Sequence, residues 1–254
     1  MACGRRTNPH LTAFLTLQTI PVYPGYIPDR PSALNLLADL KKNNGPNDGG
    51  VVVENFYCFS HGSVLGLADG KDTLVAYLYS TEVALGLGNY YVPRTGIQLA
   101  HPYRFVFLDG CETATSVLWP QAFGIPARIT VTDLTSAPSV YFDHPQAFVG
   151  WRTKVPFAQG QEWDDYGKTL ELFFENWMLG YPLAQCIYVA SDRNSLDPVT
   201  GQKLKRPLPV EKNRDLWANI GGIPQRIDYL PLSYGILKVF GYVGITANGY
   251  DPNY

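Results

Sequence analysis

The sequence has few cysteines and no close spacing among them. The four cysteines, at positions 3, 58, 111 and 186, form no CxxC pair and no short-spaced framework. In a chain of 254 residues this usage indicates reduced thiols in a cytosolic protein, with a single disulfide bridge as the open alternative. No N-x-[ST] glycosylation acceptor occurs, which agrees with that interpretation.

The sequence also lacks long apolar runs. No segment reaches the ~18 apolar residues of a membrane span, and Met1-Ala-Cys-Gly-Arg-Arg lacks the apolar region of a secretory signal. We therefore expect a soluble, cytoplasmic protein without a membrane partner. A piece of a longer protein is the alternative, since a tail or a tandem module outside these residues would not be seen.

Neither sign of charge is in excess. With 20 basic and 22 acidic residues the net charge is −2, which gives no electrostatic case for a nucleic-acid partner or an anionic membrane. No glycine-rich phosphate loop is present, because Gly66-Leu-Ala-Asp-Gly70-Lys lacks the Walker spacing. We expect no cofactor and no metal ion.

The sequence contains enough apolar residues to form a large hydrophobic core. The chain is 46% hydrophobic and 17% charged, in the range of globular proteins, and 254 residues lie near the upper limit of one hydrophobic core. We expect a single domain over residues 1–254, in which 195–254 is a C-terminal extension that completes the domain.

Helix signals are clearest in two segments. Residues 33–42 carry apolar side chains at i, i+3, i+4 and i+7, with Ser32 as the predicted N-cap. Residues 168–180 carry an aromatic stripe at helical spacing, which we interpret as core packing. A weaker helix is indicated at 82–87, and a short one from Thr113.

Strand signals alternate with these helices, which is the pattern of an α/β protein. A loop is expected over 62–70, and the unit formed by residues 12–59 has the strand–helix–strand order of a parallel crossover. The fold we expect has a mostly parallel central sheet with helices on both faces. Strands are predicted over residues 12–20, 51–59, 73–79, 104–108, 128–134, 147–151 and 186–190, and in one or two segments of 230–246.

Two of the predicted strands stop at a reactive side chain beside a glycine. Phe56-Tyr-Cys-Phe-Ser leads into His61-Gly62, and Arg104-Phe-Val-Phe-Leu-Asp leads into Gly110-Cys111. Ligands of open α/β sheets bind at the carboxyl ends of the strands. If the two strands are neighbours, an imidazole and a thiol meet at one edge of the sheet as base and nucleophile.

The residues next to this pair suit acyl transfer. Backbone N–H groups and the dipole at a helix start lower the pKa of a thiol placed there, and we expect Cys111 to open such a helix. The amides of Gly62 and Cys111 are the predicted oxyanion hole. His61 is the predicted acid–base residue. Asp109, Glu112 or Asp143 could orient its ring.

Each residue alone also has a plainer interpretation. His61 could be a hydrogen-bonded loop histidine and Cys111 a small buried residue, since free cysteine is among the most buried types. Their joint placement at two strand ends favours function. A zinc site formed with His10, His101 or His144 lacks ligand spacing. An α/β-hydrolase is disfavoured, because its nucleophile precedes its histidine in the sequence.

Phe-Ser-His61-Gly62 and Phe-Leu-Asp-Gly-Cys111-Glu-Thr-Ala, each after an apolar strand, resemble the caspase-like cysteine peptidases (clan CD). The likeness is greatest to bacterial CHAT-domain proteases and extends over about residues 10–190. The separation of 50 residues (111 − 61) matches the roughly 50 of caspases. The resemblance implies a three-layer sandwich and a His/Cys dyad that hydrolyses peptide bonds without a cofactor.

The resemblance also implies a substrate pocket. Gln146-Ala-Phe-Val-Gly-Trp-Arg152 is similar to the strand that follows the nucleophile in that clan, so Gly150, Trp151 and Arg152 are candidate pocket residues. Two features depart from the family. Asp109-Gly110 replaces its usual pair of small residues, and the caspase Gln-Ala-Cys signature is absent, so no preference for aspartate is carried over.

The function predicted from the sequence is therefore a cysteine endopeptidase acting on a protein or peptide substrate, with a regulatory partner protein as a further candidate. A catalytically silent caspase-like module that binds a partner is the main alternative. A flavodoxin-like binder of small molecules is the third hypothesis, although no phosphate-binding loop supports it.

Overall fold

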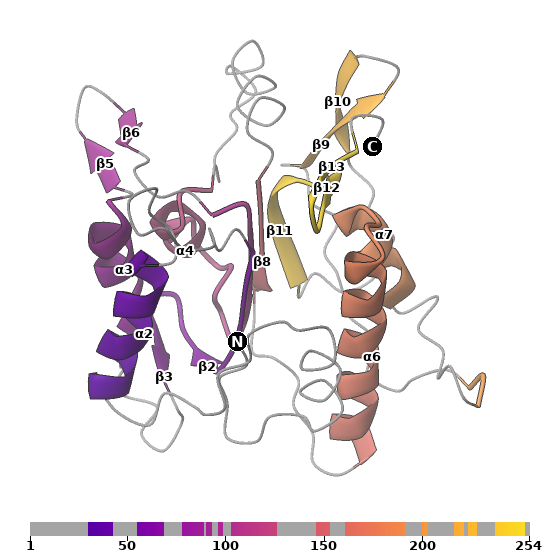
Figure 1. The fold of residues 1–254 in the computed structure, drawn as a ribbon, viewed down its shortest axis with the longest axis horizontal. Coiled ribbons are helices and arrows are strands. Elements are labelled where there is room, and N and C mark those ends of the chain that lie inside the picture. The colour runs from indigo at the N-terminus through magenta and orange to yellow at the C-terminus, as the bar shows by residue number, and fades with distance from the viewer. Residues whose placement is uncertain are drawn as a thin grey trace.

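A six-stranded sheet forms the centre of the computed structural model, which describes residues 30–42, 55–68, 78–88, 90–92, 96–98, 103–125, 146–152, 161–190, 200–202, 216–220, 223–227 and 237–251 (Figure 1). In spatial order its strands are β1 (Asn55–Phe59), β7 (Phe105–Asp109), β8 (Ala147–Trp151), β11 (Leu237–Tyr242), β9 (Leu216–Ile220) and β10 (Ile223–Ile227).

The strands β1, β7 and β8 run parallel to one another, and β9 is parallel to β11. The pairs β8–β11 and β9–β10 are antiparallel. The protein is therefore a mixed α/β protein with a mostly parallel central sheet, as predicted. Every residue of β7 and β8 is buried, which explains why these strands read as unbroken apolar runs without alternation.

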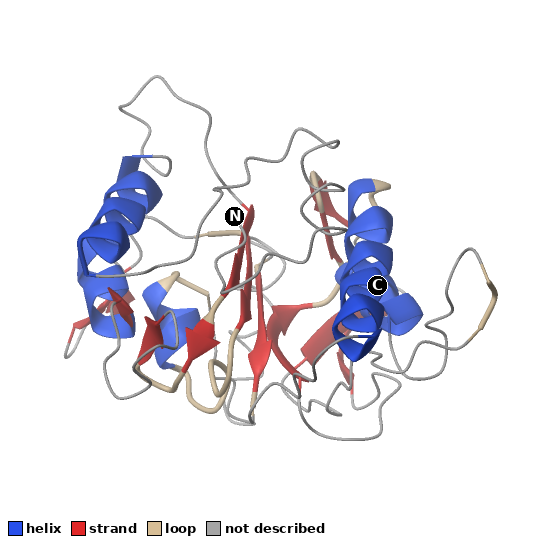
Figure 2. Cartoon of the chain, turned by 90° about the horizontal axis from the view of Figure 1, so that it is seen from below, coloured by secondary structure: helices blue, strands red, loops and turns tan. Residues whose placement is uncertain are grey.

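Helices cover both faces of this sheet (Figure 1 and Figure 2). Alternate residues of a strand point to opposite faces: Tyr57, Phe105 and Phe107 pack with one group of helices, and Val106 and Leu108 with the other. The first group is α6 (Gln161–Met178) and α7 (Leu183–Ala190), and the second is α2 (Arg30–Lys42), α3 (Ser80–Leu87) and α4 (Leu118–Ala122).

The aromatic stripe of α6 packs on the sheet, as the sequence predicts. The ring centroids of Trp177 and Phe105 lie 4.5 Å apart, and those of Phe174 and Tyr57 lie 5.0 Å apart. The helix begins at Gln161, seven residues before the predicted start. It ends near Gly180, whose φ of 84° is a left-handed conformation that glycine adopts without strain.

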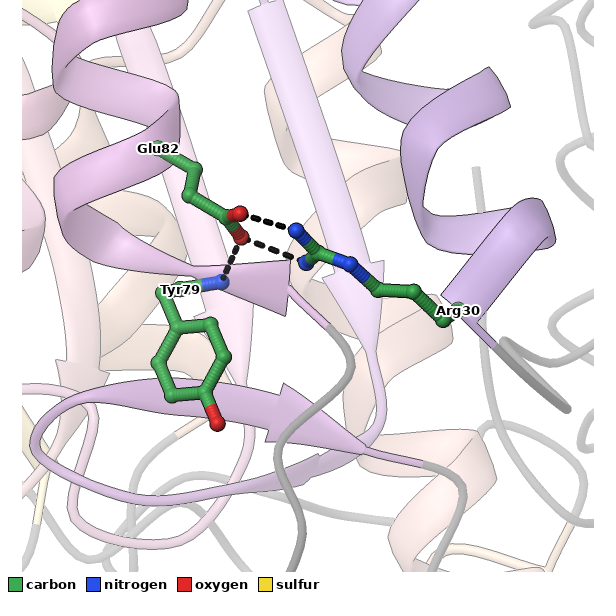
Figure 3. Close-up of polar contacts among 3 residues, drawn as sticks. All are labelled: Arg30, Tyr79 and Glu82. Atoms are coloured by element: carbon green, nitrogen blue, oxygen red, sulfur yellow. Dashed lines mark hydrogen bonds and ion pairs between the residues drawn. The ribbon is translucent and has the colours of Figure 1, made fainter.

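An ion pair joins α2 to α3 on the other face of the sheet. The Arg30 guanidinium donates two hydrogen bonds to the carboxylate of Glu82, which also accepts the N–H of Tyr79 at 3.0 Å (Figure 3). Its bonds to Arg30 lower the pKa of Glu82. Both side chains are partly exposed, so the pair contributes little more than the ~1 kcal/mol of a surface salt bridge.

Arg104 ties the C-terminal hairpin to the amino ends of β1 and β7. Its guanidinium donates to the carbonyl oxygens of Thr246 and Ala247, to that of Gly249 at 2.8 Å, and to Asn55 Oδ1 at 3.2 Å. That hairpin consists of β12 (Ile245–Thr246) and β13 (Gly249–Tyr250). The remaining short strands are β2 (His61–Gly62), β3 (Gly66–Ala68), β4 (Leu78–Tyr79), β5 (Tyr90–Val92) and β6 (Gly96–Gln98).

Four predictions of secondary structure were wrong. Residues 186–190 belong to the helix α7, whose buried residues recur at helical spacing. Residues 62–70, predicted as a loop, contain the β2–β3 hairpin. The helix α2 starts at Arg30, so Ser32 lies inside its first turn and is not its N-cap. No helix starts at Thr113, because residues 111–114 form a turn.

Other predictions lie outside the described residues, namely the segments 12–20, 51–54, 73–77 and 128–134. The strands β9 and β10 were not predicted. Within the part of the chain that the structure describes, no helix is both long enough and apolar enough to cross a membrane.

Candidate active site

The two strands that end at His61 and Cys111 are neighbours. The strand β1 pairs with β7 in parallel, with Phe59 opposite Asp109, and the N–H of Ser60 extends the pairing to the Asp109 carbonyl at 3.2 Å. Because the strands point the same way, the chain segments that follow them leave the same edge of the sheet. The predicted adjacency of these two strands is confirmed.

The backbones of the two segments touch through their glycines. A Cβ placed on Gly62 would lie 2.8 Å from the Cys111 carbonyl oxygen and 3.0 Å from the Gly110 carbonyl carbon. A Cβ placed on Gly110 would lie 2.8 Å from the Ser60 carbonyl oxygen and 3.3 Å from Gly62 N. Real Cβ atoms do not approach backbone so closely, so both positions require glycine, and the segments carrying His61 and Cys111 lie against each other.

The two reactive side chains differ in exposure. His61 is exposed on β2, opposite Ala68 of β3. Cys111 is half-buried and packs against the apolar cluster formed with α6 and α7. The structure thus brings both residues to one edge of the sheet, with the imidazole in solvent and the thiol beside apolar side chains.

A tight turn holds the hairpin that carries His61 and Gly62. Ser63 Oγ accepts the N–H groups of Leu65 and Gly66 at 3.3 and 3.0 Å. The Ser63 carbonyl accepts the indole N–H of Trp119 at 3.0 Å. Trp119 is a buried residue of α4, so the hairpin is anchored to the core. No feature of the sequence links Trp119 to this turn.

Cys111 opens a turn instead of the predicted helix. The turn covers residues 111–114, and Thr115 N–H donates to the Glu112 carbonyl at 3.2 Å. Glu112 has a φ of 58°, the left-handed conformation that non-glycine residues adopt rarely and at a cost. The helix dipole expected behind Cys111 is therefore absent, and a strained turn presents the thiol instead.

Thr113 holds this turn against the adjacent strand. Its Oγ1 lies 2.9 Å from both the Leu108 and Gly110 carbonyl oxygens and accepts the N–H of Trp151 at 3.2 Å. Its methyl carbon lies 2.9 Å from the place a Cβ on Gly62 would occupy. One small side chain thus contacts the cysteine turn, the histidine strand and β8, although the sequence analysis gave it no role.

Asp109 lies fully buried at the end of β7 and accepts three aromatic donors. Its carboxylate binds the Tyr57 hydroxyl at 2.9 Å, the Trp151 indole N–H at 2.7 Å, and the Tyr166 hydroxyl at 2.7 and 2.8 Å. Burial raises the pKa of Asp109 to about 6, although the three hydrogen bonds lower it.

Asp109, Glu112 and Asp143 are the three acids expected to orient the His61 imidazole. The hydrogen-bond partners of Asp109 among the described residues are aromatic and do not include His61. Glu112 is half-buried in the turn beside Cys111, and Asp143 lies outside the described residues. Asp109 is therefore no longer a candidate for orienting the His61 ring.

The three candidate pocket residues lie in different surroundings. A Cβ on Gly150 would lie 2.8 Å from both Thr113 Oγ1 and a Phe148 ring carbon, so close packing explains this glycine. Trp151 is buried and hydrogen-bonded to Asp109. Arg152 is exposed, and its carbonyl accepts the Thr115 hydroxyl at 2.8 Å. Of the three, Arg152 alone offers a side chain to solvent.

Two further cysteines of the described residues, Cys58 and Cys186, are buried. Both are free thiols, and burial raises the pKa of Cys186 to about 12. Over the described ranges, no three His, Cys, Asp or Glu residues are grouped so that they could hold a metal ion. His10, His101 and His144 lie outside those ranges.

Models of protein families, curated proteins and solved structures were all searched, and none matches the chain. The functional interpretation therefore rests on the residues at the ends of β1 and β7.

Proposed function

We propose that the protein is a cysteine endopeptidase in which Cys111 is the nucleophile and His61 the acid–base residue. The observation that carries the proposal is the backbone contact between Gly62 and Gly110-Cys111 at the shared edge of two parallel strands. An imidazole that reaches the thiol across these neighbouring segments would activate it as a nucleophile.

The proposed reaction proceeds in two steps. His61 takes the proton of Cys111, and Sγ attacks the carbonyl carbon of the peptide bond, so a C–S bond forms and the carbonyl electron pair moves to oxygen. The amides of Gly62 and Cys111 would donate to this oxyanion. The C–N bond then breaks, His61 protonates the leaving amine, and water hydrolyses the thioester with His61 as base.

The arrangement of elements supports the caspase-like three-layer sandwich as the finer description of the fold. The histidine strand β1, the cysteine strand β7 and the following strand β8 lie side by side in that order. Helices lie on both faces of the sheet. The strand β8 carries Gly150 and Trp151, and Arg152 follows it directly; these are the residues that the resemblance assigns to the substrate pocket.

The chemistry sets the conditions under which the protein would work. A peptidase of this kind needs a reduced thiol, so we propose a reducing compartment such as the cytoplasm. The free thiols of Cys58 and Cys186 agree with this proposal. The substrate would be a protein or peptide, and the reaction uses no cofactor.

Covalent labelling tests the proposal. A peptide chloromethyl ketone should attach to Cys111, as located by peptide mapping and mass spectrometry, and should abolish cleavage of a peptide library. Cys111→Ala should lose both labelling and cleavage, and His61→Ala should slow both. Cys58→Ala, which changes a buried thiol on the neighbouring strand, is the matched control and should retain both. Cleavage that survives in Cys111→Ala would remove the proposal.

A catalytically silent module that binds a partner protein is the second candidate. The observation that favours it is the burial of Gly150 and Trp151, which leaves Arg152 as the one exposed side chain of the candidate pocket. In that case the probe would label Cys111 no faster than it labels a small thiol in solution, and wild-type protein would cleave no peptide of the library.

A further inference from the structure

Asp109 is a buried charged residue that the proposed mechanism does not use. It is fully buried two residues before Cys111, and the one role expected for it from the sequence, orienting the His61 ring, does not match its hydrogen bonds. An unpaired buried carboxylate is costly, and such groups persist where hydrogen bonds satisfy them. Here three donors do so, which makes the group part of a specific arrangement and not a defect of packing.

The three donors come from three different elements. Tyr57 lies on β1, Trp151 on β8 and Tyr166 on α6, while Asp109 itself ends β7. A single carboxylate therefore joins three adjacent parallel strands to the helix that covers them. The junction lies directly before Gly110 and Cys111, so any shift of Asp109 is passed to the turn that carries the thiol.

We infer that Asp109 is a positioning residue for Cys111. The ionised carboxylate of Asp109 holds the ends of β1, β7 and β8 against α6 and thereby fixes the turn that carries the thiol. The inference rests on the proposed function, because a position for the thiol matters where the thiol reacts. Asp109 is sealed among aromatic side chains, so its role is distinct from contact with substrate.

The donors match the ionised form of Asp109. A carboxylate only accepts hydrogen bonds, whereas a carboxylic acid carries an O–H that must itself be accepted. Among the described residues, the titratable groups that face Asp109 are the two tyrosines, from β1 and α6, and the facing group on β8 is the neutral indole of Trp151. Burial and the adjacent Asp109 raise the pKa of Tyr57 and of Tyr166 well above the usual range, so both remain donors.

The ionisation of Asp109 gives the inference a testable pH dependence. Burial raises the pKa of Asp109 to about 6, so the group is ionised at neutral pH and protonated in mild acid. Below pH 6 the wild-type protein should therefore behave like Asp109→Asn, which has no ionised form at any pH. Above pH 7 the two proteins should differ most.

The experiment compares Asp109→Asn and Tyr166→Phe with Tyr103→Phe as the matched control. Tyr103 is also a fully buried tyrosine, and its hydroxyl donates to the Leu40 carbonyl at 3.1 Å. It packs with the helices on the opposite face of the sheet, away from Asp109. Tyr166→Phe removes one donor and keeps the carboxylate, so it also serves if Asp109→Asn folds poorly.

Two rates are measured from pH 5 to pH 9. The first is peptide cleavage, resolved into kcat and KM. The second is alkylation of Cys111 by iodoacetamide, followed by peptide mapping, which requires no peptidase activity. The second rate separates the two proposals: a wild-type protein that cleaves nothing removes the proposed function, while the alkylation rates still test the role of Asp109.

The inference predicts that both variants lower kcat about 10- to 100-fold at pH 7.5 with little change in KM, the size expected for a misplaced reacting group. The ratio of the wild-type alkylation rate to that of Asp109→Asn should rise as the pH increases through about 6. A ratio that is flat with pH, or variants that change both rates no more than Tyr103→Phe, would overturn the inference.

Discussion

The two ends of the β1–β7 strand pair are built in opposite ways. At the amino end, Arg104 donates to three carbonyl oxygens of the C-terminal hairpin and to the side chain of Asn55. At the carboxyl end, the backbones of Gly62 and Gly110 touch, and Glu112 adopts a positive φ. The amino end is closed by polar side-chain contacts, whereas the carboxyl end is shaped by the absence of side chains.

This difference separates an end of the strand pair with structural contacts from the end that carries the candidate site. The Arg104 contacts join the hairpin to the sheet, so that end has a structural role. At the other end, the glycines let two backbones meet while His61 stays exposed and Cys111 half-buried. A strained backbone conformation persists where surrounding contacts hold it. Here the hydrogen bonds of Thr113 hold the strained turn at Glu112, and those of Asp109 lie next to that turn in the chain.

The largest effect is expected from a methyl group at the glycine contact. Gly110→Ala places a Cβ 2.8 Å from the Ser60 carbonyl oxygen, and overpacking of this kind costs about 1–3 kcal/mol. We expect chemical denaturation to show that loss, and labelling of Cys111 to slow on the order of 100-fold.

Gly249→Ala is the control at the other end of the strand pair. Among the described residues, a Cβ there would meet only Thr246 Oγ1, at 3.9 Å, so the unfolding free energy should change by no more than about 0.5 kcal/mol. Equal effects of the two substitutions would remove the distinction between the two ends.

The buried carboxylate should make stability depend on pH. Asp109 has a pKa of about 6 in the folded protein against 3.8 for a free side chain, so the native state binds this proton more tightly than the unfolded state. The resulting stabilisation is fully present below about pH 4 and is lost as the pH rises through about 6. It is on the order of 3 kcal/mol, from about 1.4 kcal/mol per unit over about two units.

The measurement is the difference in unfolding free energy between wild-type protein and Asp109→Asn at pH 4, 5, 6, 7 and 8. A difference is required because other carboxyl groups titrate in the same pH range. The bonds to Arg30 lower the pKa of Glu82, so the contribution of Glu82 to stability is lost as the pH falls, opposite to that of Asp109. The wild-type protein should lose stability relative to the variant between pH 4 and pH 6 and stay level above. A difference in unfolding free energy that is constant with pH would show that folding does not raise the pKa of Asp109.

A smaller loss of stability is expected from removing the Thr113 hydroxyl, and a serine at this position should reverse most of that loss. Thr113→Val removes the acceptor of the buried Trp151 N–H and the donor to the carbonyls beneath the turn. Leaving such groups unsatisfied costs about 1–3 kcal/mol, and the labelling of Cys111 should slow. Thr113→Ser keeps the hydroxyl and should restore most of both quantities in thermal unfolding and labelling assays. If the serine variant behaves like valine, the hydroxyl does not hold the turn.

The smallest effect on the candidate site is expected from the opposite end. Arg104→Lys keeps the charge but loses the planar fork that reaches several carbonyls, and unfolding free energy should fall by about 1–2 kcal/mol. The rate of Cys111 labelling should stay at the wild-type value. Slower labelling in this variant would mean that the two ends of the strand pair are not independent.

The sequence could predict the elements whose signal is local. The strand β8 was predicted at its observed bounds because an apolar run of five residues is framed by polar ones. The neighbouring position of β1 and β7 was a condition of the functional hypothesis, and the structure meets it. The glycines beside His61 and Cys111 were predicted as part of the candidate site, but the contact between the two backbones that they permit is known only from the structure.

The features that were missed depend on residues far apart in the chain. Nothing near Asp109 in the sequence indicates that Tyr57, Trp151 and Tyr166 supply its donors, because these residues come from separate elements. Residues 186–190 were assigned to a strand because a short apolar run fits a buried helix equally well. The turn after Cys111 was mistaken for a helix because tertiary hydrogen bonds of Thr113, and not local propensity, set its shape.

The most direct test of the central claim, that two strand ends bring His61 and Cys111 together, is a disulfide formed across them. His61→Cys should form a bridge with Cys111 under mild oxidation, since disulfides need Cα atoms about 4.4–6.8 Å apart. His61→Cys combined with Cys111→Ala should form none. Peptide mapping that finds the bridge in the first protein alone is the predicted result. Two free thiols in the oxidised His61→Cys protein would contradict it.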